Sequence, residues 1–280
     1  MSHEKPIIRK GIVAGQFYPD RPDVLRHEVR TFLDHASSRP DPSVRGLIVP
    51  HAGYMYSGGI AAEAYRAIDG AQAEVIVVAA FLHRIFIQGV FIDKADSYET
   101  PLGRIPVNKT LAEKIRDASP YLADTISGDL NEHSLEVQLP FLQMAVKDFT
   151  LLPVYIGEPS VANAEALSEA LSRELAGKRA LFVFSTDLSH FHPYKEAVDM
   201  DHKLIRMIGD RDVRRLERSN YAGEIEACGF GPVITSLFLA EKLGWEGPRL
   251  LKYANSGDIT GEKGSVVGYA AMAYKVNPEA

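Results

Sequence analysis

Three histidines of this chain each come shortly after an apolar segment that is typical of a buried strand. They are His51 after residues 47–50, His83 after residues 75–80, and His190 after residues 181–185. In open α/β sheets, ligands bind in the crevice beyond the carboxyl ends of the strands. Parallel strands would therefore bring the three imidazoles to one edge of one sheet. We predict a functional site there, against the alternative that each is a loop histidine with a local hydrogen bond.

The only cysteine in the sequence, Cys228, precedes a Gly-Phe-Gly-Pro segment and an expected helix start at Pro232. A lone cysteine is most often a small buried hydrophobe. The start of a helix, however, stabilises negative charge and favours the thiolate. Two imidazoles and a thiolate suit zinc, iron(II) or copper. Three protein ligands would also leave a coordination position open, as in reactive metal sites.

Further polar residues lie close to these histidines in sequence. Asp187 precedes His190 by three residues, so one turn would bring the carboxylate to the ring. Such a carboxylate fixes the tautomer of an imidazole and raises its basicity, which suits a metal ligand or a general base. His133 stands at the start of an amphipathic segment. We predict Asp187, His190 and His133 as catalytic residues; the alternatives are a capping Asp187, a surface His190 and a helix start capped by Asn131 or Ser134.

The loop that His51 opens reads His-Ala-Gly-Tyr-Met-Tyr-Ser-Gly-Gly. Its glycines allow tight turns and close approach to a ligand. A helix start there would present free N–H groups to an anion, although the lysine of a phosphate-binding loop is missing. Tyr54 and Tyr56 are candidates to donate to a substrate oxygen, and packing is the alternative for both.

The elements that must position these residues alternate along the chain. Strands are expected at residues 45–50, 74–80, 149–156 and 180–185, and two closing strands near 250–254 and 265–274. Helices are expected at residues 110–118, 162–175, 193–208 and 232–243, one after a Ser57 cap, and one carrying Leu135, Leu139, Leu142 and Val146. This alternation predicts an α/β fold with a mostly parallel or mixed central sheet and helices on both faces. No linker or repeat divides residues 1–280, so we expect a single domain.

The composition argues against several classes of protein. The 280 residues are 46% hydrophobic and 24% charged, with a net charge of -6, which does not favour nucleic acid or an anionic membrane as a partner. No secretory signal and no run of about 20 apolar residues is present, so we expect a cytoplasmic location. The motifs of lipase-like serine hydrolases, zincin proteases and nicotinamide enzymes are missing as well.

Six segments together resemble the Memo family, and they extend along nearly the whole chain. They are Ala14-Gly-Gln-Phe-Tyr-Pro19, Pro50-His-Ala-Gly-Tyr-Met-Tyr-Ser-Gly58, Glu132-His-Ser-Leu-Glu-Val-Gln-Leu-Pro-Phe-Leu142, Ser185-Thr-Asp-Leu-Ser-His190, Ala227-Cys-Gly229 and Asn255-Ser-Gly-Asp-Ile-Thr-Gly261. The resemblance implies a fold similar to class III extradiol dioxygenases, which bind non-haem iron through two histidines and a glutamate.

Carried over to this sequence, the resemblance implies His51, His83 and Cys228 as ligands of a single iron, copper or zinc ion. Asp187, His190 and His133 would line the same pocket. A thiolate is softer than a carboxylate and favours copper or zinc more. Ring-cleaving activity therefore does not follow from the fold.

The chain departs from the family pattern before His83. Memo proteins usually have Gly-Pro-Ser or Gly-Pro-Asn there, whereas this chain has Ala80-Phe-Leu-His83. Bulky apolar residues replace a tight polar turn, so we expect a change in the direction of His83 or in the width of the pocket.

Three functions stay open at this point. The first is a metal-dependent oxidoreductase with an unknown substrate. The second is a non-catalytic module that binds a peptide, or that works with AMMECR-domain and radical-SAM proteins, which the resemblance names as partners. The third is a hydrolase that uses Cys228 or a metal-bound water as its nucleophile.

Overall fold

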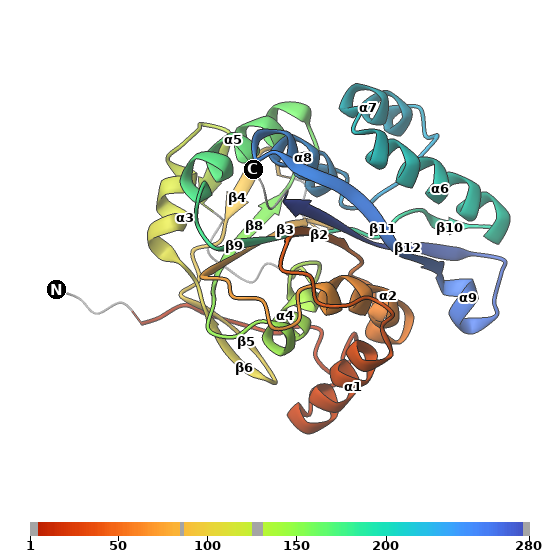
Figure 1. Ribbon diagram of the computed structural model, residues 1–280, viewed down its shortest axis with the longest axis horizontal. Helices are drawn as coiled ribbons and strands as arrows, with labels where there is room; N and C mark the ends of the chain where they lie inside the picture. Colours follow the sequence, from red (N-terminus) through yellow and green to blue (C-terminus); the bar gives the residue numbers. More distant parts are fainter. Residues whose placement is uncertain (1–4, 85–86, 125–130, 277–280) are drawn as a thin grey trace.

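A large central sheet between two layers of helices dominates the computed structural model, which describes residues 5–84, 87–124 and 131–276 (Figure 1). The strands of the described chain are β1 (Ile8–Lys10), β2 (Val44–Val49), β3 (Val75–Phe81), β4 (Val90–Ile92), β5 (Ser97–Thr100), β6 (Gly103–Pro106), β7 (Leu122–Asp124), β8 (Thr150–Ile156), β9 (Ala180–Ser185), β10 (His190–His192), β11 (Trp245–Asn255) and β12 (Val266–Val276). Its helices are α1 (Pro22–His35), α2 (Tyr54–Ala67), α3 (Lys109–Arg116), α4 (Leu139–Ala145), α5 (Val161–Leu175), α6 (Tyr194–Asp210), α7 (Val213–Tyr221), α8 (Phe230–Lys242) and α9 (Ser256–Thr260), with a 3-10 turn η1 (Glu136–Gln138).

The strand order of the central sheet is β10-β12-β2-β9-β3-β8-β4-β7, and β11 pairs with β12. The four inner strands β2, β9, β3 and β8 are parallel. The closing strands β11 and β12 are antiparallel to each other, and β12 is antiparallel to β2. The predicted α/β fold with a mixed sheet is therefore confirmed, including its antiparallel edge. A separate small sheet contains β1, β5 and β6.

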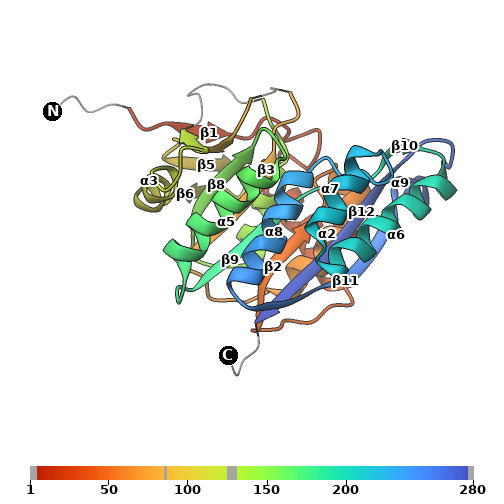
Figure 2. The same cartoon turned by 90° about the horizontal axis from the view of Figure 1, so that it is seen from above.

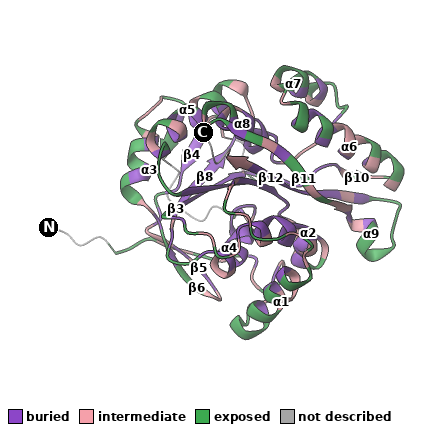
Figure 3. Ribbon diagram, viewed as in Figure 1, coloured by how far each residue is buried: buried purple, intermediate pink, exposed green. Residues whose placement is uncertain are grey.

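The inner strands are apolar throughout because helices cover both faces of the sheet. Along β3, Ile76 and Val78 enter a core shared with α1, α2 and α4. The alternate residues Val75 and Val77 enter a second core, shared with α3, α5, α6 and α8. Figure 1 shows α5, α6, α7 and α8 on one side of the sheet and α1, α2 and α4 on the other, and Figure 2 looks down onto the first of these layers. Figure 3 shows the inner strands buried while α1 and α7 expose their outer faces.

Helix α2 begins earlier than the sequence suggested. We expected Ser57 to cap it, but the helix starts at Tyr54 after Gly53. Ser57 lies inside the first turns and its hydroxyl donates to the carbonyl of Ala52 at 2.9 Å. The early start turns Tyr54 inward, which matters for the site described below.

The segment that carries Glu132 and His133 reaches helix α4 through the turn η1. We expected a helix that carries Leu135 and Leu139 with Pro140 near its first turn. The position of Pro140 is confirmed, because it lacks an N–H group and lies in the first turn of α4, but the α-helix begins only at Leu139, so Leu135 lies before it. None of the helices in the described residues is both long and apolar enough to cross a membrane.

Three adjacent parallel strands bring their carboxyl ends to one edge of the sheet. Val49 at the end of β2 pairs with Ser185 at the end of β9, and β9 in turn pairs with β3. His51, Asp187 and His83 follow these strand ends, so the three side chains start from neighbouring points.

We expect Phe184→Ala to lower the free energy of unfolding by about 3–5 kcal/mol, because it removes a ring from a close-packed core. Phe184 is 0% exposed in β9, whereas Phe191 in β10 is 74% exposed. Phe191→Ala is the matched control, with an expected change within about 0.5 kcal/mol. Denaturant titration followed by circular dichroism measures both variants. Equal losses would contradict the described packing.

Candidate metal centre

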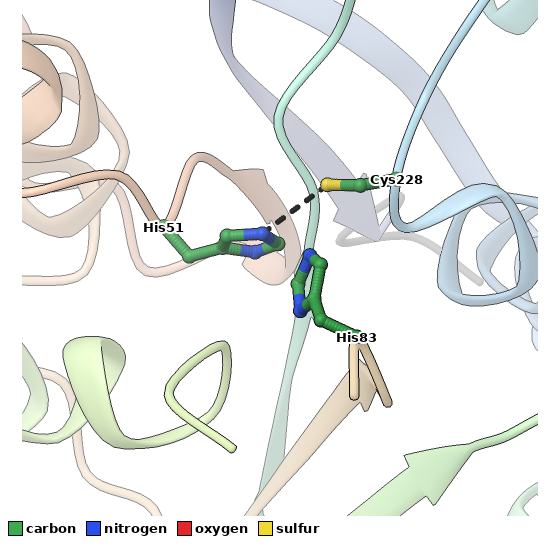
Figure 4. A group of neighbouring side chains, drawn as sticks. All are labelled: His51, His83 and Cys228. Carbon is green, nitrogen blue, oxygen red and sulfur yellow. Dashed lines mark hydrogen bonds between the residues drawn. The ribbon is translucent and has the colours of Figure 1, made fainter. Parts of the chain in front are cut away.

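His51, His83 and Cys228 come together at the edge of the sheet (Figure 4). A ring nitrogen of each histidine and the sulfur of Cys228 all lie within 4.8 Å of one another. The sulfur is 3.2 Å from Nε2 of His51. The two imidazole rings stand almost perpendicular, with centroids 5.0 Å apart. The ligand set that the sequence predicted is therefore assembled by the fold.

The proton on the His51 ring is fixed by Ser185. The Ser185 hydroxyl donates to the carbonyl of Ser134 at 2.7 Å and accepts from the Gln138 side-chain amide at 2.8 Å. A hydroxyl has one proton to donate. Nδ1 of His51, 2.8 Å from the same oxygen, must therefore be the donor. This leaves the lone pair of Nε2 facing Cys228.

The surroundings of His51 also keep its ring neutral. Burial lowers the pKa of His51 well below its usual value, and the neighbouring His83 and His133 lower it further. The orientation of the Gln138 amide is set on its far side, where its oxygen accepts from the hydroxyl of Tyr65 at 2.8 Å. A neutral imidazole with a free Nε2 is the form that binds metals.

Glu132 fixes the position of the proton on the ring of His83. Its carboxylate accepts from the backbone N–H of His83 at 2.6 Å and contacts the ring nitrogen Nδ1 at 3.0 Å. Burial alone would raise the pKa of Glu132, but the hydrogen bonds from His83 and Ser134 outweigh it and lower the pKa to about 2. An ionised carboxylate accepts the Nδ1 proton and leaves Nε2 of His83 free, as is usual for metal-bound histidines.

The apolar residues before His83 do not remove it from the site. Leu82 is buried, and its N–H donates to the carbonyl of Ile156 at 3.3 Å. The Phe81 carbonyl accepts from the Ser134 hydroxyl at 2.7 Å, and the Phe81 ring packs edge-on against His83. The departure from the family pattern thus gives His83 an aromatic neighbour while His83 keeps its direction toward His51.

Cys228 approaches His51 because Gly229 packs directly on the end of β9. A Cβ atom at Gly229 would lie 2.2 Å from the carbonyl oxygen of Ser185 and 2.6 Å from Cβ of Thr186. The Gly229 N–H donates to the Thr186 hydroxyl at 2.9 Å. Any larger residue would therefore push the Cys228 segment away from the sheet.

The expectation that the helix start makes Cys228 a thiolate is wrong for the metal-free protein. Burial raises the pKa of the thiol far above its usual value, and the charge of Asp187 raises it further. The backbone N–H of Asp187 donates to the sulfur at 3.1 Å, which does not compensate. Without a cation the sulfur keeps its proton, so binding of a metal must displace it.

Asp187 contacts the backbone beyond β2 rather than the ring of His190. Its Oδ1 accepts from the N–H of His51 at 2.7 Å, and the N–H of Ala52 also donates to it. Burial outweighs these bonds and raises the pKa of Asp187 to about 7. A carboxyl group beside Cys228 is thus able to take up or release a proton near neutral pH.

The two remaining predicted histidines lie at the edge of the same cluster. The ring of His133 stacks on His83 with centroids 4.9 Å apart, and burial lowers its pKa to about 4. His190 lies half-buried in β10, and its N–H donates to Glu226 at 3.2 Å. It is close enough to His51 for a charge on its ring to lower the pKa of His51, which places it near the centre.

The two tyrosines differ in their positions. Tyr54 belongs to the core: it is 2% exposed, and its hydroxyl donates to the carbonyl of Val137 at 2.7 Å. The structure therefore does not place it where a substrate would bind. Tyr56 is half-buried and lies near Tyr269, whose pKa is raised first by burial and then by the charge of Asp187.

Sequence reasoning missed the residues that orient the two ligand histidines. Glu132, Ser185 and Gln138 lie in the segments that carry the family resemblance, but we predicted no role for them. All three are buried. Ser185 and Gln138 are polar residues at the end of or within apolar stretches, and because a buried polar group needs a partner, that pattern was an available signal; Glu132 stands among the polar residues Asn131, His133 and Ser134, where the sequence gives no such signal.

The fold and the site define a mixed α/β protein with a His-His-Cys group that could hold a metal ion at the carboxyl edge of its central sheet. A family model described as Memo-like protein matches residues 9–273. A MEMO1 family protein of Methanosarcina mazei is 37% identical over 95% of this chain and 98% of its own length. One from Thermotoga petrophila is 36% identical over 93% and 97%. The chain belongs to the Memo-like family.

A solved structure supports the fold alone. An uncharacterized protein of Escherichia coli K12 aligns with a TM-score of 0.53 at 16% identity, covering 84% of this chain and 100% of its own.

We expect Ser185→Ala to weaken metal binding by roughly 10–100-fold, the usual effect of removing a group that orients a ligand. The Nδ1 proton of His51 would lose its acceptor, so the ring would no longer hold Nε2 toward Cys228. Competition with a coloured chelator measures the affinity. Ser172→Ala on the outer face of α5 is the matched control, and equal affinities in both variants would contradict the role of Ser185.

We expect Asp187→Asn to stabilise the metal-free protein at neutral and higher pH. The pKa of Asp187 is about 7 in the fold, against an ordinary value of 3.8. Between these values the folded state keeps a proton that the unfolded chain has lost, so wild-type stability falls as pH rises. The variant lacks this loss. Its free energy of unfolding should exceed that of wild type by close to zero at about pH 4 and by roughly 2–4 kcal/mol at about pH 8. Urea unfolding across this range tests it, with the exposed Asp34→Asn as control; a constant difference would refute the assignment.

Proposed function

We propose that this protein is a metal-dependent oxidoreductase whose ion is held by His51, His83 and Cys228. The observation that supports it is the fixed orientation of both imidazoles. Ser185 and Glu132 each accept an Nδ1 proton, which leaves two Nε2 lone pairs facing one sulfur. This is the arrangement in which metal-bound histidines are usually held.

The donor set favours a redox metal of intermediate or soft character. Two imidazoles with one thiolate suit copper, iron or zinc, and three protein ligands leave a position open for a reactant. When bound, copper or iron would supply one-electron chemistry, whereas zinc would act only as a Lewis acid.

The residues around the centre supply proton transfer. Asp187 adjoins Cys228, and its pKa of about 7 lets it exchange a proton with a reactant at neutral pH. His190 and His133 have pKa values lowered mainly by burial, so they stay neutral and act as hydrogen-bond partners. A substrate would therefore meet a metal on one side and a proton acceptor on the other.

A hydrolase with Cys228 as nucleophile is supported less well, because burial and Asp187 raise the pKa of the thiol. From the family resemblance alone we also propose AMMECR-domain and radical-SAM proteins as partners. Binding of such a partner or of a peptide that persists after loss of the metal ligands would favour a non-catalytic module instead.

The test offers Fe(II), copper and Zn(II) separately to the protein under anaerobic conditions and measures the retained metal after gel filtration. We expect the wild-type protein to retain copper or iron. The variants His51→Ala and Cys228→Ala should each lose the ion that Cys228 ligates in wild type. His192→Ala is the control, because that ring contacts Glu226 and Glu196 at the surface.

Electron paramagnetic resonance then follows oxidation and reduction of the retained ion. Retention of no metal above background, or of zinc alone, would refute the oxidoreductase.

A further inference from the structure

We propose a second cation position formed by His83, Glu132 and His133. A carboxylate oxygen and one nitrogen of each ring lie within 4.8 Å of one another. Two imidazoles and one carboxylate are a harder ligand set than the His-His-Cys group. The position therefore suits a divalent cation such as iron(II), manganese(II) or zinc, and it shares His83 with the first centre.

The spacing of the ligand atoms matches that of a bound ion. Nδ1 of His83 is 3.0 Å from Oε1 of Glu132, and Nδ1 of His133 is 3.4 Å from the same oxygen. With metal–ligand bonds of about 2.1 Å, neighbouring ligands in octahedral or tetrahedral geometry lie about 3.0–3.4 Å apart. Both distances from Oε1 therefore fall in the range that a shared cation requires.

The side chains are held in place before any ion arrives. The ring of His133 lies between His83 and Phe17, with centroid distances of 4.9 Å and 4.8 Å. The Glu132 carboxylate is fixed by the backbone N–H groups of residues 83, 133 and 134. The side chains of His83 and His133 keep 26% and 18% of their surface exposed, so an ion can reach them from solvent.

The ring of His83 connects the two positions. Nε2 serves the first centre, while Nδ1 faces Glu132. A cation beside Glu132 takes the place of the Nδ1 proton, which goes to solvent, and with both positions filled His83 bridges the ions as an imidazolate. When the first position is filled as well, each ion at the second position therefore releases one proton; when the first position is empty, the proton can move to Nε2 instead. The simpler alternative, in which Glu132 only orients His83, predicts neither the second ion nor this proton.

Anaerobic titration of the metal-free full chain with Co(II) separates the two positions. We expect wild type to bind two equivalents and to show a thiolate-to-cobalt charge-transfer band. Cys228→Ala should retain one equivalent without the band, and His133→Phe one equivalent with it. Phenylalanine keeps the ring between Phe17 and His83, so this variant should fold, which circular dichroism checks. His192→Ala is the control and should bind two.

The proposal stands or falls on the ion that His133 controls, and it does not depend on the first centre. The proposal is supported if one equivalent of Co(II) is lost in His133→Phe but kept in Cys228→Ala and His192→Ala. It is also supported if His133→Phe releases one proton fewer than wild type in weakly buffered solution. Equal stoichiometry in His133→Phe and wild type would overturn it, and so would loss of the second ion in His192→Ala. Loss of the charge-transfer band in every protein would instead refute the first centre.

Discussion

Buried polar groups must be hydrogen-bonded, and at the edge of this sheet one segment, residues 132–138, supplies most of the partners. The carbonyl of Ser134 takes the only proton of Ser185, and Gln138 donates to the same hydroxyl. His51 is left with one arrangement, in which Nδ1 donates. Glu132, at the start of the same segment, fixes His83. Two ligands from different strands thus owe their orientation to one stretch of chain.

The two imidazoles are held by acceptors of different charge, and this makes them unequal as ligands. His51 donates to a neutral hydroxyl, whereas His83 faces an ionised carboxylate. A carboxylate raises the basicity of the ring that it accepts from, so His83 is the stronger donor of electrons. Cys228, the third proposed ligand, keeps its proton in the metal-free protein. Binding of a metal to this group would therefore be coupled to proton release.

Residues 12–18, near the beginning of the described chain, cover the segment that orients the two histidines. Glu136 accepts from the backbone N–H groups of Ile12 and Val13 and from the hydroxyl of Tyr18. These bonds anchor the N-terminal segment on the turn η1, and Phe17 then packs against His133. The family segment around Phe17 has a structural role here: it covers the stretch that orients the ligand histidines.

The sequence by itself determined the inner strands and most of the helices that cover them, and it put His51 and His83 at one edge of the sheet. The apolar strands that precede His51 and His83 can be recognised locally in the sequence. Because these strands are parallel members of one sheet, the two histidines lie close together. Local patterns did not determine the contacts among those neighbours. Asp187 meets the His51 backbone because β2 pairs with β9, and Tyr54 turns into the core because α2 starts before Ser57. Strand order and helix starts depend on contacts between distant segments, so only the tertiary structure decided which polar group holds which histidine.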